Sequence, residues 1–179
     1  NLVTLATRHG ADRARAVRDY ERLLEPLGWH LQVFADAPTL QALEVPLRRC
    51  RVDVVIDHMG LPDAAAGTQQ PGFQALLRLM EREHVWTKLA GADRITRAGG
   101  RLRDAVAFMR ALAAVAPQRL VWGSDWPHIG FHAGKQVHGD AVLPYRDIDV
   151  TQLLEVLFEA IPDPRAVLAD NPAKLYAYL

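Results

Sequence analysis

The sequence has little cysteine, no excess of charge of either sign and no long hydrophobic run. Cys50 is the single cysteine in 179 residues, which excludes an internal disulfide framework and a metal knuckle built from several cysteines. Lys+Arg and Asp+Glu both total 21. Because proteins that grip phosphate backbones are usually basic, we do not expect a nucleic-acid partner. No apolar run approaches the roughly 18 residues that span a bilayer and no signal peptide is visible, so we expect no membrane association and a cytoplasmic location.

Strand-sized apolar runs alternate with helix-sized amphipathic runs along the chain. The strand candidates are residues 29–34, 52–56, 85–89 and 120–122. Between them, apolar residues recur at three-to-four spacing, as over 73–80. This alternation predicts βαβ units and a parallel sheet buried on both faces, in a single α/β domain over residues 1–179. Near the end, Asn171 followed by proline predicts an N-cap that opens a last short helix.

Polar side chains follow three of the predicted strands. His58 follows the second run, Arg94 the third, and Asp125 and His128 the fourth. Sites in parallel α/β proteins lie at the carboxyl ends of the strands, so we expect these side chains to converge at one rim. An imidazole, a guanidinium and a carboxylate would there offer a carbonyl polariser, an anion clamp and a base.

Each of these residues also has a structural interpretation. His58 would fit a hydrogen-bonded core histidine, Asp125 a turn cap, and Arg94 a solvated loop charge. Asp57 precedes a turn glycine, and we favour for it a bond to its own backbone. Gln32 alternates with His30 on the first strand, and the pair could face the site or be satisfied in the core.

A zinc motif on the segment after the last strand has weak support. His128 and His132 are four residues apart, a spacing that would place two imidazoles on one face of a helix. Gly130 lies between them, and the glutamate of a HExxH motif is absent.

Five motifs together resemble a known family. They are DHMG at 57–60, PGF at 71–73, VWTKLAG at 85–91, RLVWGSDWPH at 119–128 and DNPAKLY at 170–176. In this order and spacing they resemble amidohydrolase-related family 2 of the amidohydrolase superfamily, and most of all its branch of 2-pyrone-4,6-dicarboxylate lactonases and sugar lactonases. The resemblance implies a (β/α)₈ TIM barrel with its site at the carboxyl face of the strands. Residues 1–3 resemble the end of strand four, so the chain would be the C-terminal part of an incomplete barrel, about strands 4/5 to 8 with their helices.

The resemblance also implies a chemistry, the metal-independent hydrolysis of a lactone by an activated water. Asp125 would take a proton from the water, and His58 would donate a hydrogen bond to the lactone carbonyl. Arg94 would pair with a carboxylate of a small, carboxylated, lactone-like substrate. Arg8 and His128 are further candidates for substrate binding.

Metal binding by this chain has little support. Other members of the superfamily hold a divalent ion with a His-x-His pair at strand one, and the sequence contains no His-x-His. Only His58 and Asp125 could bind such an ion, whereas a catalytic zinc site typically has three protein ligands. We therefore expect no cofactor in the lactonase branch, and a divalent metal such as Zn²⁺ at most in a full-length parent.

Two other functions stay open at this point. One is a metal-dependent decarboxylase or amide hydrolase of the same superfamily. The other is a non-enzymatic remnant or binding module with a flavodoxin-like open sheet, although the sequence has no glycine-rich phosphate loop. A part-barrel also exposes two strand edges and an apolar inner face. We therefore expect little or no hydrolase activity from the chain alone, and a homo-oligomer that covers the open face.

Overall fold

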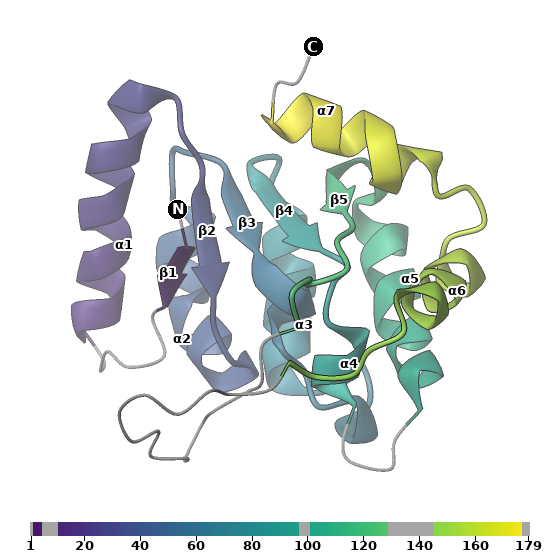
Figure 1. Cartoon of the computed structure of the whole chain (residues 1–179). Helices are drawn as coiled ribbons and strands as arrows, with labels where there is room; N and C mark the ends of the chain where they lie inside the picture. The colour runs from purple at the N-terminus through teal and green to yellow at the C-terminus, as the bar shows by residue number, and fades with distance from the viewer. Residues whose placement is uncertain (1, 5–10, 97–100, 129–144, 177–179) are drawn as a thin grey trace.

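One parallel sheet organises the molecule. The computed structural model describes residues 2–4, 11–96, 101–128 and 145–176. The strands are β1 (Leu2–Thr4), β2 (Leu31–Phe34), β3 (Val54–Ile56), β4 (Val85–Lys88) and β5 (Leu120–Val121). Each strand pairs in parallel with the next one along the chain, in the order β1-β2-β3-β4-β5 (Figure 1). The four predicted runs match β2 to β5 to within two residues.

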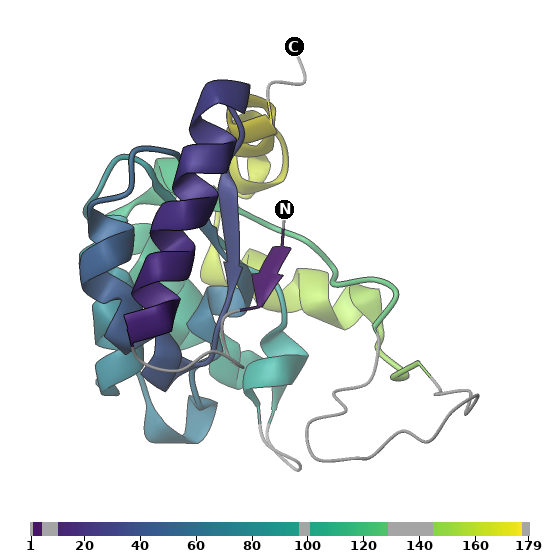
Figure 2. The same cartoon turned by 90° about the vertical axis from the view of Figure 1, so that its left-hand side faces the viewer.

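Helices follow the strands, and four of them cover one face of the sheet. They are α1 (Ala11–Leu24), α2 (Ala37–Arg48), α3 (Pro71–Met80), α4 (Ala92–Ile95), α5 (Val106–Val115), α6 (Val150–Ala160) and α7 (Asn171–Tyr176). Helices α1, α2, α3 and α5 lie on the same side of the sheet, each in contact with the next (Figures 1 and 2). Helix α7 lies at the end of the sheet where the strands begin, and α4 lies at the opposite end (Figure 1). None of the described helices is long and apolar enough to cross a membrane.

Shorter turns connect these elements. They are 3₁₀ turns at Glu25–Leu27, Asp57–Gly60, Ala64–Ala66, Leu102–Ala105 and Pro117–Arg119, and a π turn at Ala166–Asp170.

The strand order identifies the architecture as part of a (β/α) barrel. In a doubly wound sheet the strand order reverses at a switch point and helices cover both faces. Here the strand order is the chain order, and α1, α2, α3 and α5 cover one face. The incomplete-barrel prediction is confirmed, and the flavodoxin-like open sheet is wrong because that fold needs a reversal in strand order.

The two faces of the sheet differ in what covers them. Val54 and Ile56 point to the helices and belong to the main core, where they are fully buried. Val55, Trp86 and Val121 form a separate small cluster, against which Leu175 of α7 packs. The face that carries this cluster is the inner face of the part-barrel. Because side chains alternate along a strand, residues two positions after Val55, Trp86 and Val121 also lie on the inner face, at the carboxyl ends of the strands.

Asn171 corrects one prediction about the end of the chain. It does not cap α7, because its own backbone is helical (φ −68°, ψ −46°) and the preceding π turn runs directly into α7. Its side chain is buried, and Nδ2 donates hydrogen bonds to the carbonyl oxygens of Pro117 and Leu120, both at 2.8 Å. Asn171 therefore ties α7 to the start of β5.

Candidate active site

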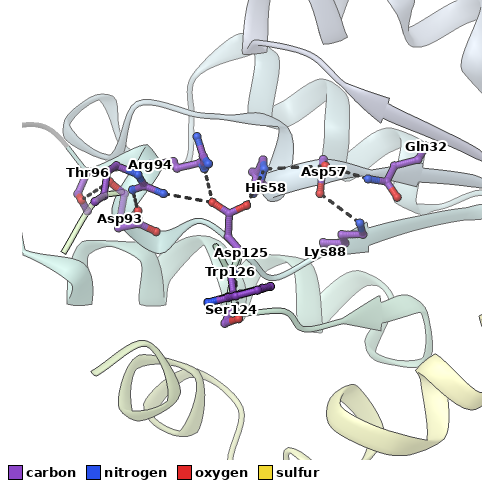
Figure 3. Close-up of polar contacts among 11 residues, drawn as sticks. Gln32, Asp57, His58, Lys88, Asp93, Arg94, Thr96, Ser124, Asp125 and Trp126 are labelled. Atoms are coloured by element: carbon purple, nitrogen blue, oxygen red, sulfur yellow. Dashed lines mark hydrogen bonds and ion pairs between the residues drawn. The ribbon is translucent and has the colours of Figure 1, made fainter. Parts of the chain in front are cut away.

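The carboxyl ends of β3, β4 and β5 bring together the three side chains that the sequence singled out. His58 lies in the turn after β3, Arg94 on α4 after β4, and Asp125 four residues after β5 (Figure 3). His58 Nε2 is 3.7 Å from Asp125 Oδ1. Arg94 Nε donates a hydrogen bond to Asp125 Oδ2 at 2.5 Å. The predicted convergence is therefore present, while the chemical role of each residue stays a prediction.

Strained backbone marks the same rim. His58, Met59, Leu61, Asp125 and His128 all have positive φ values, between 47° and 64°. The left-handed region costs a residue with a Cβ about 1–2 kcal/mol. Residues held in such conformations cluster at functional sites, where the surrounding structure maintains them. The burial of His58, Met59 and His128 supplies that constraint here.

The imidazole of His58 lies between two carboxylates. Nε2 is 3.8 Å from Asp57 Oδ2 and 3.7 Å from Asp125 Oδ1, and the side chain is 8% exposed. Burial lowers the pKa of His58 from its ordinary value, although the two carboxylates act in the opposite direction. The ring is therefore neutral near pH 7. Carboxylate oxygens beside Nε2 favour the tautomer that carries its proton there, so Nε2 can donate a hydrogen bond to a substrate.

The other ring nitrogen of His58 is unusual. Nδ1 is buried and has no hydrogen-bond partner among the described residues. A core histidine satisfied by hydrogen bonds, the structural interpretation of His58, therefore does not describe it. Phe34 packs edge-on against the ring at 5.6 Å between centroids. On the Nδ1 side lies Gly91, where a Cβ would come within 2.8 Å of Nδ1.

Two guanidinium groups hold the carboxylate of Asp125. Arg94 Nε and Arg146 Nη2 both donate to Oδ2, at 2.5 and 3.2 Å. Arg146 also forms an ion pair with Asp93. Charge-assisted bonds of this kind fix the orientation of a carboxylate. As a result Oδ1 is the oxygen of Asp125 that faces His58.

Asp57 belongs to the site, and the interpretation of it as a backbone-bonding turn residue is wrong. Its carboxylate is buried, Oδ2 accepts a hydrogen bond from Gln32 Nε2 at 3.0 Å, and Oδ1 is 3.5 Å from Lys88 Nζ (Figure 3). The sequence left open whether Gln32 faces the site or is satisfied in the core, and the structure shows that it faces the site. Sequence reasoning missed Lys88, although a lysine that ends a buried strand is a signal, since lysine is almost never fully buried without a partner.

A cavity of about 380 Å³ joins these groups. Asp57, His58, Lys88 and Asp125 line it at the strand ends, and the cavity extends along the inner face to Tyr176 of α7. A larger hollow of about 860 Å³ lies between Leu102 and Val156, is lined mostly by charged residues and contains none of the site residues. The candidate site residues His58 and Asp125 therefore share the smaller cavity.

The remaining candidates have different positions. His128 is buried outside the cavity lining, its backbone N–H donates to Asp125 O, and both ring nitrogens lack hydrogen-bond partners among the described residues. His30 packs edge-on against Tyr176, at 5.6 Å between centroids, and burial lowers its pKa. Arg94 is 9% exposed, so the solvated-loop interpretation is wrong. Arg8 and His132 lie outside the described residues.

The described residues do not fit a catalytic metal ion. No group of three or more histidine, cysteine, aspartate or glutamate side chains in the described part of the chain is arranged to hold one. His58 and Asp125 supply two donors, fewer than a catalytic zinc site uses. Two guanidinium groups contact Oδ2 of Asp125, and their positive charges oppose a cation beside the same carboxylate.

Comparisons with known proteins agree with this architecture. Residues 3–177 match the model of the family described as Amidohydrolase. A 4-sulfomuconolactone hydrolase of Hydrogenophaga intermedia is 35% identical over 150 residues, which are 84% of this chain and 47% of that protein. A D-galactarolactone isomerase of Agrobacterium fabrum is 35% identical over 133 residues, 73% of this chain and 42% of that protein.

A solved structure shows the same likeness. The crystal structure of a Pseudomonas putida protein, provisionally named 2-pyrone-4,6-dicarboxylic acid hydrolase, superimposes with a TM-score of 0.70 at 31% identity. The match covers 98% of this chain and 62% of that one. The chain spans about half the length of the curated relatives it matches.

Proposed function

This chain belongs to the amidohydrolase family, and we propose that its site takes part in the hydrolysis of a lactone, a cyclic carboxylic ester. The observation that carries the proposal is the pair of Asp125 Oδ1 and His58 Nε2, 3.7 Å apart at one cavity. A carboxylate that can accept a proton thus stands beside an imidazole that can donate a hydrogen bond. A relative named as a lactone hydrolase supports the same class of substrate.

In the proposed reaction, Asp125 Oδ1 takes a proton from a water molecule as the water oxygen bonds to the ring carbonyl carbon. The carbonyl oxygen becomes an oxyanion, to which His58 Nε2 donates a hydrogen bond. Collapse of this intermediate breaks the ring C–O bond, and the leaving oxygen takes the proton from Asp125. The net change is lactone plus water to hydroxy acid. Removing one hydrogen-bond donor to an oxyanion typically lowers kcat by about 10²–10³-fold.

Arg94 and Arg146 have a positioning role in this scheme. Their bonds to Oδ2 hold the carboxylate with Oδ1 toward His58, so the base and the hydrogen-bond donor act on the same carbonyl group. The contact of Arg94 with a substrate carboxylate stays a prediction. In the structure that guanidinium pairs with Asp125.

The proposed reaction uses no metal ion held by the described residues. A metal-dependent decarboxylase or amide hydrolase of the same superfamily would lose activity to a chelator and regain it with Zn²⁺. Activity measured before and after chelation therefore separates that alternative from the proposal.

Asp125→Asn tests the proposal in the whole protein that carries this chain, because we expect little or no turnover by the chain alone. Asp53→Asn is the matched control, since Asp53 is exposed and lies outside the cavity. A panel of carboxylated and neutral lactones is incubated with each protein, and NMR of the products distinguishes ring opening from isomerisation. We expect kcat to fall at least about 10²-fold in the Asp125 variant and to stay unchanged in the control. Unchanged turnover by Asp125→Asn would contradict the assignment of the base.

Two further expectations remain proposals. A second copy would cover the inner face where α7 leaves it open, since exposed sheet edges and apolar faces favour association. The cytoplasmic location expected from the sequence is the other.

A further inference from the structure

Lys88 is the one lysine or arginine among the described residues that line the cavity. It is the last residue of β4 and lies on the inner face with Trp86, two positions earlier. Its side chain is 22% exposed, and Nζ is 3.5 Å from Asp57 Oδ1. The guanidinium groups of Arg94 and Arg146 lie instead against Asp125 and outside the lining.

The charges of the cavity make this lysine significant. Asp57 and Asp125 both border the cavity, so an anionic substrate would meet two carboxylates. Asp125 has two guanidinium groups beside it, whereas the described partners of Asp57 are the amide of Gln32, Lys88 and the imidazole of His58. An amide and a neutral imidazole carry no charge, so neither of them balances the negative charge of Asp57. Among the residues that the structure describes, Lys88 is therefore the cation that makes this end of the cavity acceptable to an anion.

We infer that Lys88 binds the acidic group of the substrate, a carboxylate or a sulfonate, and determines the preference for acidic over neutral lactones. An ammonium group has three N–H donors, so Lys88 can bond Asp57 with one and a substrate oxygen with another. The inference rests on the proposed function and names the substrate class of the same site.

The geometry also orients the substrate. Asp57 lies between His58 and Lys88, with Nε2 of the imidazole 3.8 Å from Oδ2 and Nζ of the lysine 3.5 Å from Oδ1 (Figure 3). An acidic group at Lys88 therefore lies on the Asp57 side of the imidazole. The ring carbonyl lies on the opposite side, between His58 and Asp125.

The test compares Lys88→Met, Lys88→Arg and a matched control in the whole protein. The control, Lys174→Met, removes the same charge from an exposed lysine of α7 that lies over Trp86 and outside the cavity lining. We expect Lys88→Met to raise KM for a carboxylated lactone about 10- to 100-fold. The increase should be much smaller for a neutral lactone, Lys88→Arg should restore most of the loss on the carboxylated lactone, and Lys174→Met should change neither substrate. Equal losses on both lactones would overturn the inference.

A double variant separates a direct contact from simple neutralisation of Asp57. If Lys88 only offsets the charge of Asp57, then Asp57→Asn combined with Lys88→Met restores the affinity for the carboxylated lactone, and the inference fails. If Lys88 contacts the anion, the double variant regains only the part of the loss that comes from the uncompensated charge of Asp57, and it still binds the carboxylated lactone more weakly than the wild type. A thermal unfolding curve for each variant establishes that the variant is folded under the conditions of the assay.

If no lactone is hydrolysed, the proposed function fails. A binding measurement then still tests the inference about Lys88. Benzene-1,3-dicarboxylate is titrated by calorimetry against the wild type, Lys88→Met and Lys174→Met, with the neutral dicarboxamide as the comparison ligand. Dicarboxylate binding that is at least about tenfold weaker in Lys88→Met alone supports the inference. Equal binding by the three proteins, or no binding by the wild type, overturns it.

Discussion

Replacing Gly91 by alanine tests whether the space beside His58 sets the position of its imidazole. Gly91 has φ +72°, and an added Cβ would lie 2.8 Å from Nδ1 and 3.1 Å from Cγ of His58. The left-handed backbone costs alanine about 1–2 kcal/mol in the free energy of unfolding. The backbone of His58 belongs to a buried turn, so the imidazole must move and Nε2 leaves its place between the carboxylates. We expect kcat for lactone hydrolysis to fall by about 10²–10³, the worth of one oxyanion donor.

Gly28→Ala is a matched control for this substitution. Gly28 also has a left-handed backbone, φ +63° and ψ 27°, but nothing lies within 4 Å of its added Cβ. Urea unfolding should show the cost of the left-handed backbone alone in Gly28→Ala and a larger loss in Gly91→Ala, whose Cβ also clashes with the imidazole, and only Gly91→Ala should lose turnover. Equal kcat values for the two folded variants would refute the reasoning that the missing Cβ of Gly91 positions His58.

Two further predictions concern stability. Asn171→Ala leaves the buried carbonyl group of Leu120 without this donor and removes the hydrogen bond to Pro117, so the free energy of unfolding in urea should fall by about 1–3 kcal/mol. A loss near zero would contradict the anchoring role. Burial lowers the pKa of His58 below its ordinary 6.5, so the unfolded chain binds this proton more readily than the folded protein. Stability should be complete above about pH 6.5 and decline as the pH falls through the lower folded pKa. His58→Gln should flatten that decline in thermal melts between about pH 7 and 5, and identical slopes for His58→Gln and wild type would contradict the burial argument.

Much of the fold was predictable because it depends on local patterns. Apolar runs of strand length alternate with amphipathic helical runs, and the observed β2 to β5 follow them closely. The sequence did not reveal the role of Asn171. An asparagine before a proline has the same local pattern whether it begins a helix or continues a preceding turn, and the π turn at Ala166–Asp170 decides between the two.

The site was predictable to the extent that it depends on strand ends. His58, Arg94 and Asp125 follow three neighbouring parallel strands, and their convergence follows from that topology. Arg146 lies 21 residues after Asp125, in a segment with no periodic pattern, so nothing in the sequence linked the two. Asp57 was misread because a turn glycine follows it, whereas its carboxylate turns to side chains on the adjacent strands.

The sequence by itself determined which chemical groups stand at the carboxyl ends of the strands, because alternation and periodicity are local properties that place those ends. Only the tertiary structure decided which group each of them meets. The two guanidinium groups on Asp125, the lysine beside Asp57 and the missing Cβ that admits the imidazole of His58 come from separate strands and loops. Their distances depend on how the sheet curves and how the helices pack behind it, and no local pattern encodes those distances.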